Sequence, residues 1–221
     1  MARGSPKPNG ETNPDAITLG VLSAIEEDDR ATQRAISKEL GIALGLTNAY
    51  LKRCVRKGFV KVRQIPANRY AYYLTPQGFA EKSRLTALYL SISFNFFRSA
   101  REQCAELIAT CAARRWHRVA LAGYGDLAEI ATLCGREEDS VEIVGIIDTR
   151  ANPFDPAPAM FAGYPVVRNL ADLTKVNAVI VTDIYNGQRV FEELARIIPP
   201  ERLLTPRLLN VSRAQPRLAD E

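Results

Sequence analysis

The sequence is poor in the residues that most often carry catalysis or bind metal ions. Among its 221 residues there is one histidine, His117, and the four cysteines form no C-x-x-C pair. No His, Lys or Tyr-x-x-x-Lys group is placed for hydride or proton transfer, so we expect neither a metal site nor an enzyme. Because no secretory leader is evident, we expect reduced cysteines and a cytoplasmic protein.

Long hydrophobic runs are absent as well. The longest apolar stretch, residues 85–97, is about half the length of a membrane span. It is also interrupted by Thr86, Ser91, Ser93 and Asn95. We therefore expect no membrane partner. With 47% hydrophobic and 24% charged residues, the composition is that of an ordinary globular protein, and the length accommodates two domains.

Acidic residues are scarce in one part of the chain. Between Arg30 and Arg69 there are ten basic residues and one acidic residue, Glu39. Such a local excess of positive charge is expected on a solvated face or on a surface that meets a polyanion. Whether this charge marks a solvated face or a surface for a polyanion depends on the helices and strands that carry these residues.

Three short helices are predicted in the first half of the chain. Residues 1–14, rich in Gly, Pro, Ser and Asn, are expected to form a disordered arm. Apolar residues then recur at helical spacing over 15–27, with Asp15 as the N-cap. A second helix is predicted over 33–40, between Thr32 and Gly41, and a third over 46–57.

The third helix is predicted to have a basic outer face. Its inward positions are expected to be Thr47, Leu51, Cys54 and Val55. Two short helices joined by a tight turn, the second basic on its outer face, are the geometry that places a recognition helix in the DNA major groove. Residues 59–65 and 70–74 follow as a two-stranded hairpin.

Together these segments resemble the winged helix-turn-helix domain of MarR-type transcription regulators. The resemblance rests on residues 36–41 (Ile-Ser-Lys-Glu-Leu-Gly), 53–60 and 74–78 (Leu-Thr-Pro-Gln-Gly). It implies double-stranded DNA as a partner, read by the third helix and the hairpin tip. The candidate DNA-binding residues are Asn48, Lys52, Arg53, Arg56, Arg63, Asn68 and Arg69. A winged helix used for protein contacts is the alternative.

A long helix is predicted from Pro76 to about residue 115. Between residues 85 and 97 it is apolar on nearly every side, so it must be buried on more than one side. One side can cover the DNA-binding domain, and the other can pair with the same helix of a second chain in a homodimer. Packing between the two domains of one chain is the alternative. The candidate dimer contacts are Leu85, Leu88, Tyr89, Ile92 and Phe96.

The second half alternates predicted strands and helices, which indicates an α/β domain with a parallel sheet. Strands are expected at 118–122, 141–147, 164–167, 178–182 and 202–205, with helices at 126–134 and 187–197. A Gly-x-Gly-x-x-Ala segment follows the first strand, and Asp148 ends the second. In dinucleotide-binding folds such glycines let the backbone approach a pyrophosphate, and the acid accepts a hydrogen bond from a ribose hydroxyl.

Ligands of such sheets bind beyond the carboxyl ends of the strands. The candidate cofactor-binding residues are Gly123, Tyr124, Gly125, Asp126, Leu127, Asp148, Thr182 and Asp183. Among them, Asp126 stands at the start of a helix, where it can cap the helix and would repel a phosphate.

The layout also resembles that of the Rex family of redox-sensing repressors, through residues 119–128, 142–148, 163–166 and 170–173. This resemblance implies NAD(H) as an effector. The same strand pattern is similar to small Rossmann-like domains that bind nucleotide sugars in sugar acetyltransferases and polysaccharide-assembly proteins. A nucleotide sugar therefore stays open beside NAD(H), as does a sheet whose nucleotide site has been lost.

The sequence thus predicts an α+β winged helix-turn-helix domain over 15–78 and a Rossmann-like α/β domain over 116–212. A connecting and dimerisation helix over 79–115 joins them, and residues 213–221 form a polar tail. The expected function is a DNA-binding transcription regulator modulated by a nucleotide. The alternative is a nucleotide-binding enzyme, or a scaffold protein of a polysaccharide or sugar pathway, with an appended winged helix.

Overall fold

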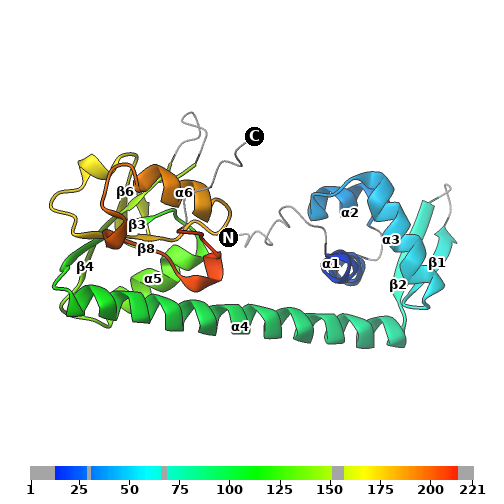
Figure 1. The fold of residues 1–221 in the computed structure, drawn as a ribbon. Coiled ribbons are helices and arrows are strands. Elements are labelled where there is room, and N and C mark those ends of the chain that lie inside the picture. The colour runs from blue at the N-terminus through cyan, green and yellow to red at the C-terminus, as the bar shows by residue number, and fades with distance from the viewer. Residues whose placement is uncertain (1–12, 29–30, 66–68, 151–156, 214–221) are drawn as a thin grey trace, which may run out of the picture. The chain divides into compact units, whose positions relative to one another are not determined.

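The computed structural model describes residues 13–28, 31–65, 69–150 and 157–213 (Figure 1). The chain divides into two compact units, Met1–Phe94 and Asn95–Glu221, and the division falls inside one long helix. Residues 1–12 of the expected arm and 214–221 of the expected tail lie outside the described residues.

The N-terminal unit contains three short helices and an antiparallel hairpin. These are α1 (Pro14–Glu27), α2 (Gln33–Leu40), α3 (Leu44–Arg56), β1 (Val60–Ile65) and β2 (Arg69–Leu74). The helix and hairpin predictions are confirmed within two residues at each boundary. The predicted cap of α1 is wrong, because the side chain of Asn13, and not that of Asp15, accepts a hydrogen bond from the backbone N–H of Asp15.

The start and end of α2 follow the predicted capping chemistry. The hydroxyl of Thr32 accepts a hydrogen bond from the N–H of Ala35 at 3.2 Å, and Gly41 takes a left-handed conformation with φ of 64°. This short helix and turn fix the direction in which α3 begins.

One core holds this unit together. It combines apolar residues of α1, α2, α3 and the hairpin with Leu85 of the long helix α4 (Pro76–Ala113). On α3 the buried residues are Thr47, Leu51 and Cys54, as predicted. Val55 is the exception, because it is 37% exposed.

The beginning of α4 is packed against the turn between α3 and β1. The hydroxyl of Thr75 donates to the carbonyl of Gly58 at 2.6 Å and accepts from the N–H of Gly78 at 3.0 Å. A Cβ atom on Gly78 would lie 2.0 Å from the carbonyl oxygen of Phe59. The Thr-Pro-Gln-Gly segment therefore caps α4 and lets it approach the backbone where the hairpin starts.

The C-terminal unit is built on a six-stranded sheet with the order β5-β6-β4-β3-β7-β8. Its strands are β3 (Arg118–Ala122), β4 (Glu142–Ile147), β5 (Met160–Phe161), β6 (Tyr164–Val167), β7 (Ala178–Val181) and β8 (Leu203–Leu204). All neighbours pair in parallel except β5, which pairs antiparallel with β6. The predicted parallel sheet is confirmed, and the edge strand β5 is an addition to it.

Helices cover both faces of this sheet (Figure 1). Val119 and Leu121 of β3 belong to a core with α5 (Asp126–Arg136) and the second half of α4. Ala120 and Ala122 belong to a core with α6 (Gly187–Leu194) on the opposite face. This alternation along β3 is what a strand buried on both faces requires.

All four cysteines are buried. Burial raises the pKa of Cys54 and of Cys111 to about 11, and that of Cys104 to about 12. These thiols are therefore protonated and pack as small apolar groups. Among the described residues, no helix combines the length and the apolarity needed to cross a bilayer.

The contact at the start of α4 can be tested by replacing Gly78 with alanine. The added methyl group would meet the backbone of Phe59, so neighbouring segments must shift. We expect the free energy of unfolding to fall by about 1–3 kcal/mol, the usual cost of overpacking, as measured by chemical denaturation.

Gly45→Ala in α3 is the matched control, because a Cβ there meets nothing within 4 Å. Alanine favours the helix over glycine by up to about 1 kcal/mol, so this variant is expected to be stabilised. Unchanged stability of Gly78→Ala would contradict the close contact.

Candidate nucleic-acid interface and candidate ligand pocket

The outer face of α3 carries positive charge. Because Thr47, Leu51 and Cys54 are buried at helical spacing, the opposite face is directed to solvent. Lys52, Arg53 and Arg56 are exposed there, and Asn48 is half-buried. The structure therefore directs Lys52, Arg53 and Arg56 away from the core, and Asn48 lies at the edge of that exposed face.

The hairpin adds further basic side chains to the same unit. Lys61 and Arg63 are exposed two residues apart on β1, so they project from one face of the strand. Lys61 lies opposite Tyr73 in the hairpin register. Of the predicted hairpin residues, Arg69 starts β2 and Asn68 lies outside the described residues. Lys61 was recognisable in the sequence by its spacing from Arg63.

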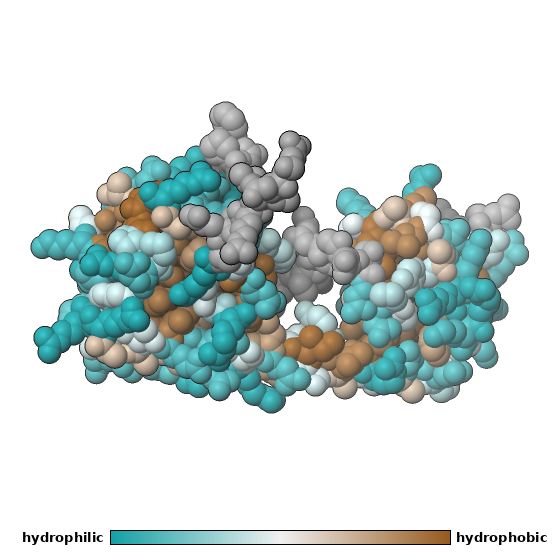
Figure 2. Space-filling view, viewed as in Figure 1, coloured by the Kyte–Doolittle hydropathy of each residue, from teal (hydrophilic) through white to brown (hydrophobic). Residues whose placement is uncertain are grey.

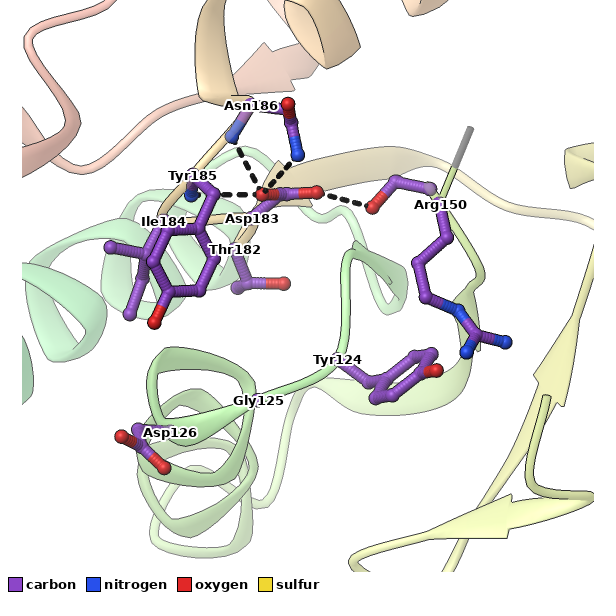
Figure 3. A pocket seen from close by; sticks show the side chains of 10 residues that line it. Tyr124, Gly125, Asp126, Arg150, Thr182, Asp183, Ile184, Tyr185 and Asn186 are labelled. Carbon is purple, nitrogen blue, oxygen red and sulfur yellow. Dashed lines mark hydrogen bonds between the residues drawn. The ribbon is translucent and has the colours of Figure 1, made fainter. Parts of the chain in front are cut away.

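A pocket of about 290 Å³ lies in the C-terminal unit, beyond the carboxyl ends of β3 and β7 (Figure 3). When the five parallel strands are numbered along the chain, their order is 3-2-1-4-5, and β3 and β7 are the first and fourth. The second and third strands extend the sheet on one side of β3, and the fourth and fifth extend it on the other side. The order of the sheet therefore reverses between β3 and β7. This is the place where open α/β sheets bind ligands.

The turn from β3 to α5 forms one wall of the pocket. Gly123 has φ of 100°, and a Cβ atom on it would lie 2.7 Å from both the N and the Cβ of Asp183. Gly125 has φ of 149° and precedes α5. The first glycine is therefore required by the close approach to β7, and the second by the backbone conformation.

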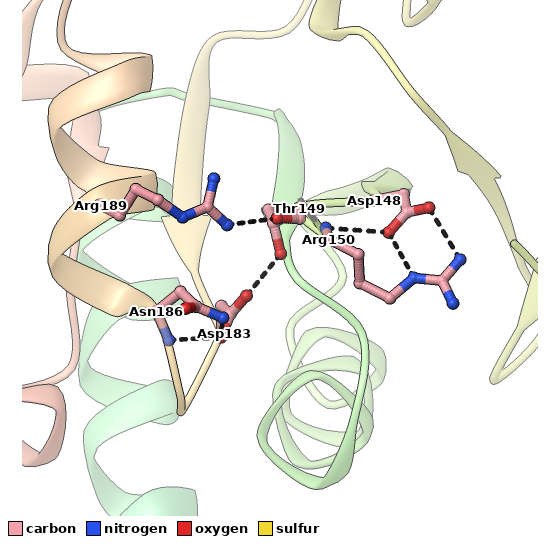
Figure 4. A network of polar contacts seen from close by, with 6 residues as sticks. All are labelled: Asp148, Thr149, Arg150, Asp183, Asn186 and Arg189. Atoms are coloured by element: carbon pink, nitrogen blue, oxygen red, sulfur yellow. Dashed lines mark hydrogen bonds and ion pairs between the residues drawn. The ribbon is translucent and has the colours of Figure 1, made fainter. Parts of the chain in front are cut away.

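Asp183 holds two loops of the pocket together (Figure 4). Its Oδ1 accepts hydrogen bonds from the N–H groups of Tyr185 at 2.9 Å and Asn186 at 2.8 Å. Its Oδ2 accepts from the hydroxyl of Thr149 at 2.6 Å. The carbonyl of Thr149 accepts in turn from Arg189 of α6 at 2.5 Å. This carboxylate fixes the loop after β7 to the segment after β4.

Asp148 is engaged by its neighbour Arg150 (Figure 4). Its Oδ1 accepts from Arg150 Nε at 3.0 Å and its Oδ2 from Arg150 Nη2 at 3.1 Å. Burial alone would raise the pKa of Asp148, but the hydrogen bonds and charge of Arg150 hold it below its usual value. The Asp148 side chain is 6% exposed, so the predicted acceptor for a ribose already has a partner on each oxygen.

The structure brings together five of the eight predicted cofactor-binding residues. Tyr124, Gly125, Asp126, Thr182 and Asp183 line the pocket. The hydroxyl of Thr182 is directed into the protein, where it contacts the carbonyl of Gly123 at 2.5 Å.

Three predicted residues lie outside the lining, each for a structural reason. Gly123 forms the turn beneath the pocket, Leu127 is fully buried in the core, and Asp148 is paired with Arg150. The lining residues missing from the prediction are Thr149, Arg150, Ile184, Tyr185 and Asn186. All five directly follow a predicted strand-end acid, so extending each loop by a few residues would have found them.

The five predicted dimer contacts on α4 fall into three groups. Leu88, Tyr89 and Ile92 are 40%, 47% and 55% exposed. Leu85 is a correction, because it is 2% exposed within the core of the N-terminal unit, where no second chain can reach it. Phe96 is half-buried and packs against the core of the C-terminal unit.

Comparison with known proteins gives one family match and several similar structures. Residues 14–61 match the family described as winged helix-turn-helix DNA-binding. No curated protein matches the chain. The PcaV transcriptional regulator of Streptomyces coelicolor, solved with its natural ligand, is 21% identical over 41% of this chain and 63% of its own, with a TM-score of 0.35.

MepR, a transcription regulator of the Staphylococcus aureus multidrug efflux pump MepA, is 25% identical over 38% of this chain and 62% of its own, with a TM-score of 0.33. A MepR–DNA complex is 24% identical over 39% of this chain and 62% of its own, with a TM-score of 0.33. This chain thus spans less than two thirds of the length of these regulators.

The family match covers α1, α2, α3 and the first residues of β1. The matched residues include the tight turn between α2 and α3, and the structure adds the rest of the two-stranded hairpin that forms the wing. The N-terminal unit is therefore a winged helix-turn-helix domain.

Proposed function

We propose that this protein is a transcription regulator that binds double-stranded DNA through its winged helix-turn-helix domain. The observation that carries the proposal is the exposed basic face of α3, formed by Lys52, Arg53 and Arg56, on the second helix of the helix-turn-helix. An α-helix of this kind fits the major groove, where arginine and lysine can read guanine and asparagine can read adenine. In this proposal the exposed side chains of Lys61 and Arg63 on the hairpin contact phosphates.

The DNA-binding surface can be tested with the double variant Lys52→Ala/Arg53→Ala. We expect affinity for duplex DNA to fall by roughly tenfold or more, and the slope of log affinity against log salt to become shallower by about one unit for each phosphate that the variant no longer neutralises. Fluorescence anisotropy over a series of salt concentrations measures both quantities.

The double variant Arg196→Ala/Arg202→Ala removes two exposed basic residues of the C-terminal unit and serves as the control for net charge. It should leave both the affinity and the salt dependence unchanged. If the α3 variant behaves like this control, the proposed surface does not bind DNA.

We further propose that the pocket of the C-terminal unit binds a nucleotide that modulates DNA binding, without turnover of the ligand. NAD(H) and a nucleotide sugar are the two candidates. The support is the position of the pocket at the reversal point of the sheet, together with the glycine turn before α5. The ligand can alter DNA affinity only if it binds two conformations of the protein differently.

The nucleotide response can be tested by native mass spectrometry of the purified protein, followed by DNA-binding titrations with NAD+, NADH and UDP-sugars. We expect one ligand class to change the affinity for DNA by about five- to 150-fold, the usual range of coupling between two sites. Unchanged DNA affinity with every one of these ligands would reject this part of the proposal.

We also propose a homodimer that pairs through the middle of α4. Hydrophobic residues gather along this part of the helix (Figure 2), where Leu88, Tyr89, Leu90 and Ile92 are all at least 40% exposed. Monomeric proteins rarely leave a continuous apolar surface of this kind in water. A two-fold dimer would also present two recognition helices to a palindromic site.

The dimer can be tested with Ile92→Asp, which places a charge in the apolar middle of α4. We expect the dimer to dissociate because an unpaired carboxylate is costly to bury, as measured by light scattering after size-exclusion chromatography. Leu133→Asp, at a leucine of α5 that is 42% exposed, is the matched control and should remain dimeric. A dimer that persists in Ile92→Asp would exclude this interface.

A further inference from the structure

The charged residues that line the pocket favour a ligand with little negative charge. Asp126 and Asp183 place carboxylates on two of its walls, and Arg150 contributes one guanidinium. That guanidinium is hydrogen-bonded to both oxygens of Asp148. The lining therefore offers a phosphate two repulsive charges and one positive charge that is already paired.

The start of α5 does not reverse this balance. A helix N-terminus carries the equivalent of roughly half a positive charge, whereas the Asp126 carboxylate at the first position of α5 carries a full negative charge. The glycine turn at Gly125 has the shape that receives a pyrophosphate in dinucleotide-binding sheets. Here an acid occupies the end of the helix that would stabilise the phosphates.

The loop that begins at Asp183 offers an aromatic surface. Tyr185 is 77% exposed and Ile184 is 40% exposed on the loop between β7 and α6 (Figure 3). Asp183 Oδ1 accepts from the N–H of Tyr185, so the backbone that carries the ring is held in place. An exposed aromatic ring on a fixed turn is a stacking surface for a planar group.

The pocket next to these residues is small, and the backbone of Gly125 is accessible from it. A Cβ atom on Gly125 would meet nothing within 4 Å, so a ligand can reach the main chain there. The pocket volume of about 290 Å³ is at the lower end of the range that holds a drug-sized molecule. It suits one ring system with its sugar better than a complete dinucleotide.

We propose that the pocket binds the nucleoside part of its ligand, with the base stacked on Tyr185, and that Asp126 and Asp183 keep phosphate groups outside it. This inference rests on the nucleotide-binding part of the proposed function and defines which portion of the nucleotide is recognised. Asp183 acts as a positioning residue for Tyr185, and Asp126 selects against a pyrophosphate.

The proposal is tested by titrating the full chain, at low ionic strength, with two series of ligands in a calorimeter. One series is adenosine, AMP and ADP, and the other is uridine, UMP and UDP. In the series that binds, we expect the nucleoside to bind at least as tightly as the diphosphate. Like charges repel, so each added phosphate brings no gain at a wall of carboxylates.

Substitutions at Tyr185 and Asp126, each with a control variant, separate the contributions of ring and charge. Tyr185→Ala should weaken nucleoside binding by roughly tenfold, the effect of losing one base–aromatic stack, while Tyr185→Phe should retain it. Asp126→Asn should strengthen diphosphate binding by about two- to fivefold, as expected for a charge removed at a helix N-terminus, and leave nucleoside binding unchanged. Glu129→Gln, an exposed acid of the same helix turn outside the lining, is the control for net charge.

The outcomes distinguish failure of the nucleoside assignment from failure of nucleotide binding itself. If the diphosphate binds about tenfold more tightly than the nucleoside, which is a difference of one decade in the dissociation constant, the nucleoside assignment is overturned and nucleotide binding stands. Unaltered nucleoside affinity in Tyr185→Ala overturns it as well. If neither series binds, nor NAD+, NADH or any UDP-sugar, the nucleotide-binding function itself is rejected.

Discussion

One uninterrupted helix supplies side chains to two separate cores, and both units depend on it. Leu85 in the first half of α4 is part of the winged-helix core. Ala100, Cys104, Ile108 and Cys111 in the second half are part of the core beneath the sheet. A break in this helix would remove packing from both units, so its sequence must serve two interiors and remain helical between them. The exposed apolar residues between the two sets belong to neither core.

The pocket shows how a familiar turn can be combined with different side-chain chemistry. The glycine at 123 is demanded by the close approach of β3 and β7, which is a property of the sheet and does not depend on the ligand. The acids at 126, 148 and 183 then determine the charge of the site. Two of them line the pocket, and the third, Asp148, is paired with Arg150. In the proposed site, backbone shape would define where a ligand binds, and the side chains would define which part of it is bound.

Much of the fold could be predicted from the sequence because the deciding signals are local. Thr32 and Gly41 at the ends of α2 act within one helical turn, and the strands of the second unit are short apolar runs between polar loops. The errors have local causes too. Asn13 is the cap because α1 begins at Pro14, one residue before Asp15. Val55 follows the buried Cys54 and is turned by about 100° around the helix from it, toward the edge of the buried face.

The candidate sites were less predictable because they depend on pairs of residues far apart in the chain. The bond between Thr149 and Asp183 joins residues 34 positions apart, and no spacing rule indicates it. The fate of Leu85 also required the structure, since an apolar residue on a long helix can face its own domain or a second chain with the same pattern. By contrast, the exposed cations of α3 follow from helical periodicity alone, and the structure places them as that periodicity requires.

The burial of every native cysteine sulfur has a practical consequence. Alkylating reagents attack the thiolate at accessible positions, so the four natural side chains are poor targets in the folded protein. A single cysteine introduced on the solvent side of α3 or at the mouth of the pocket would be modified selectively without deleting any of them. A pair of such cysteines, one in each unit, would carry two fluorophores or spin labels that report the distance between the units as DNA or small molecules are added.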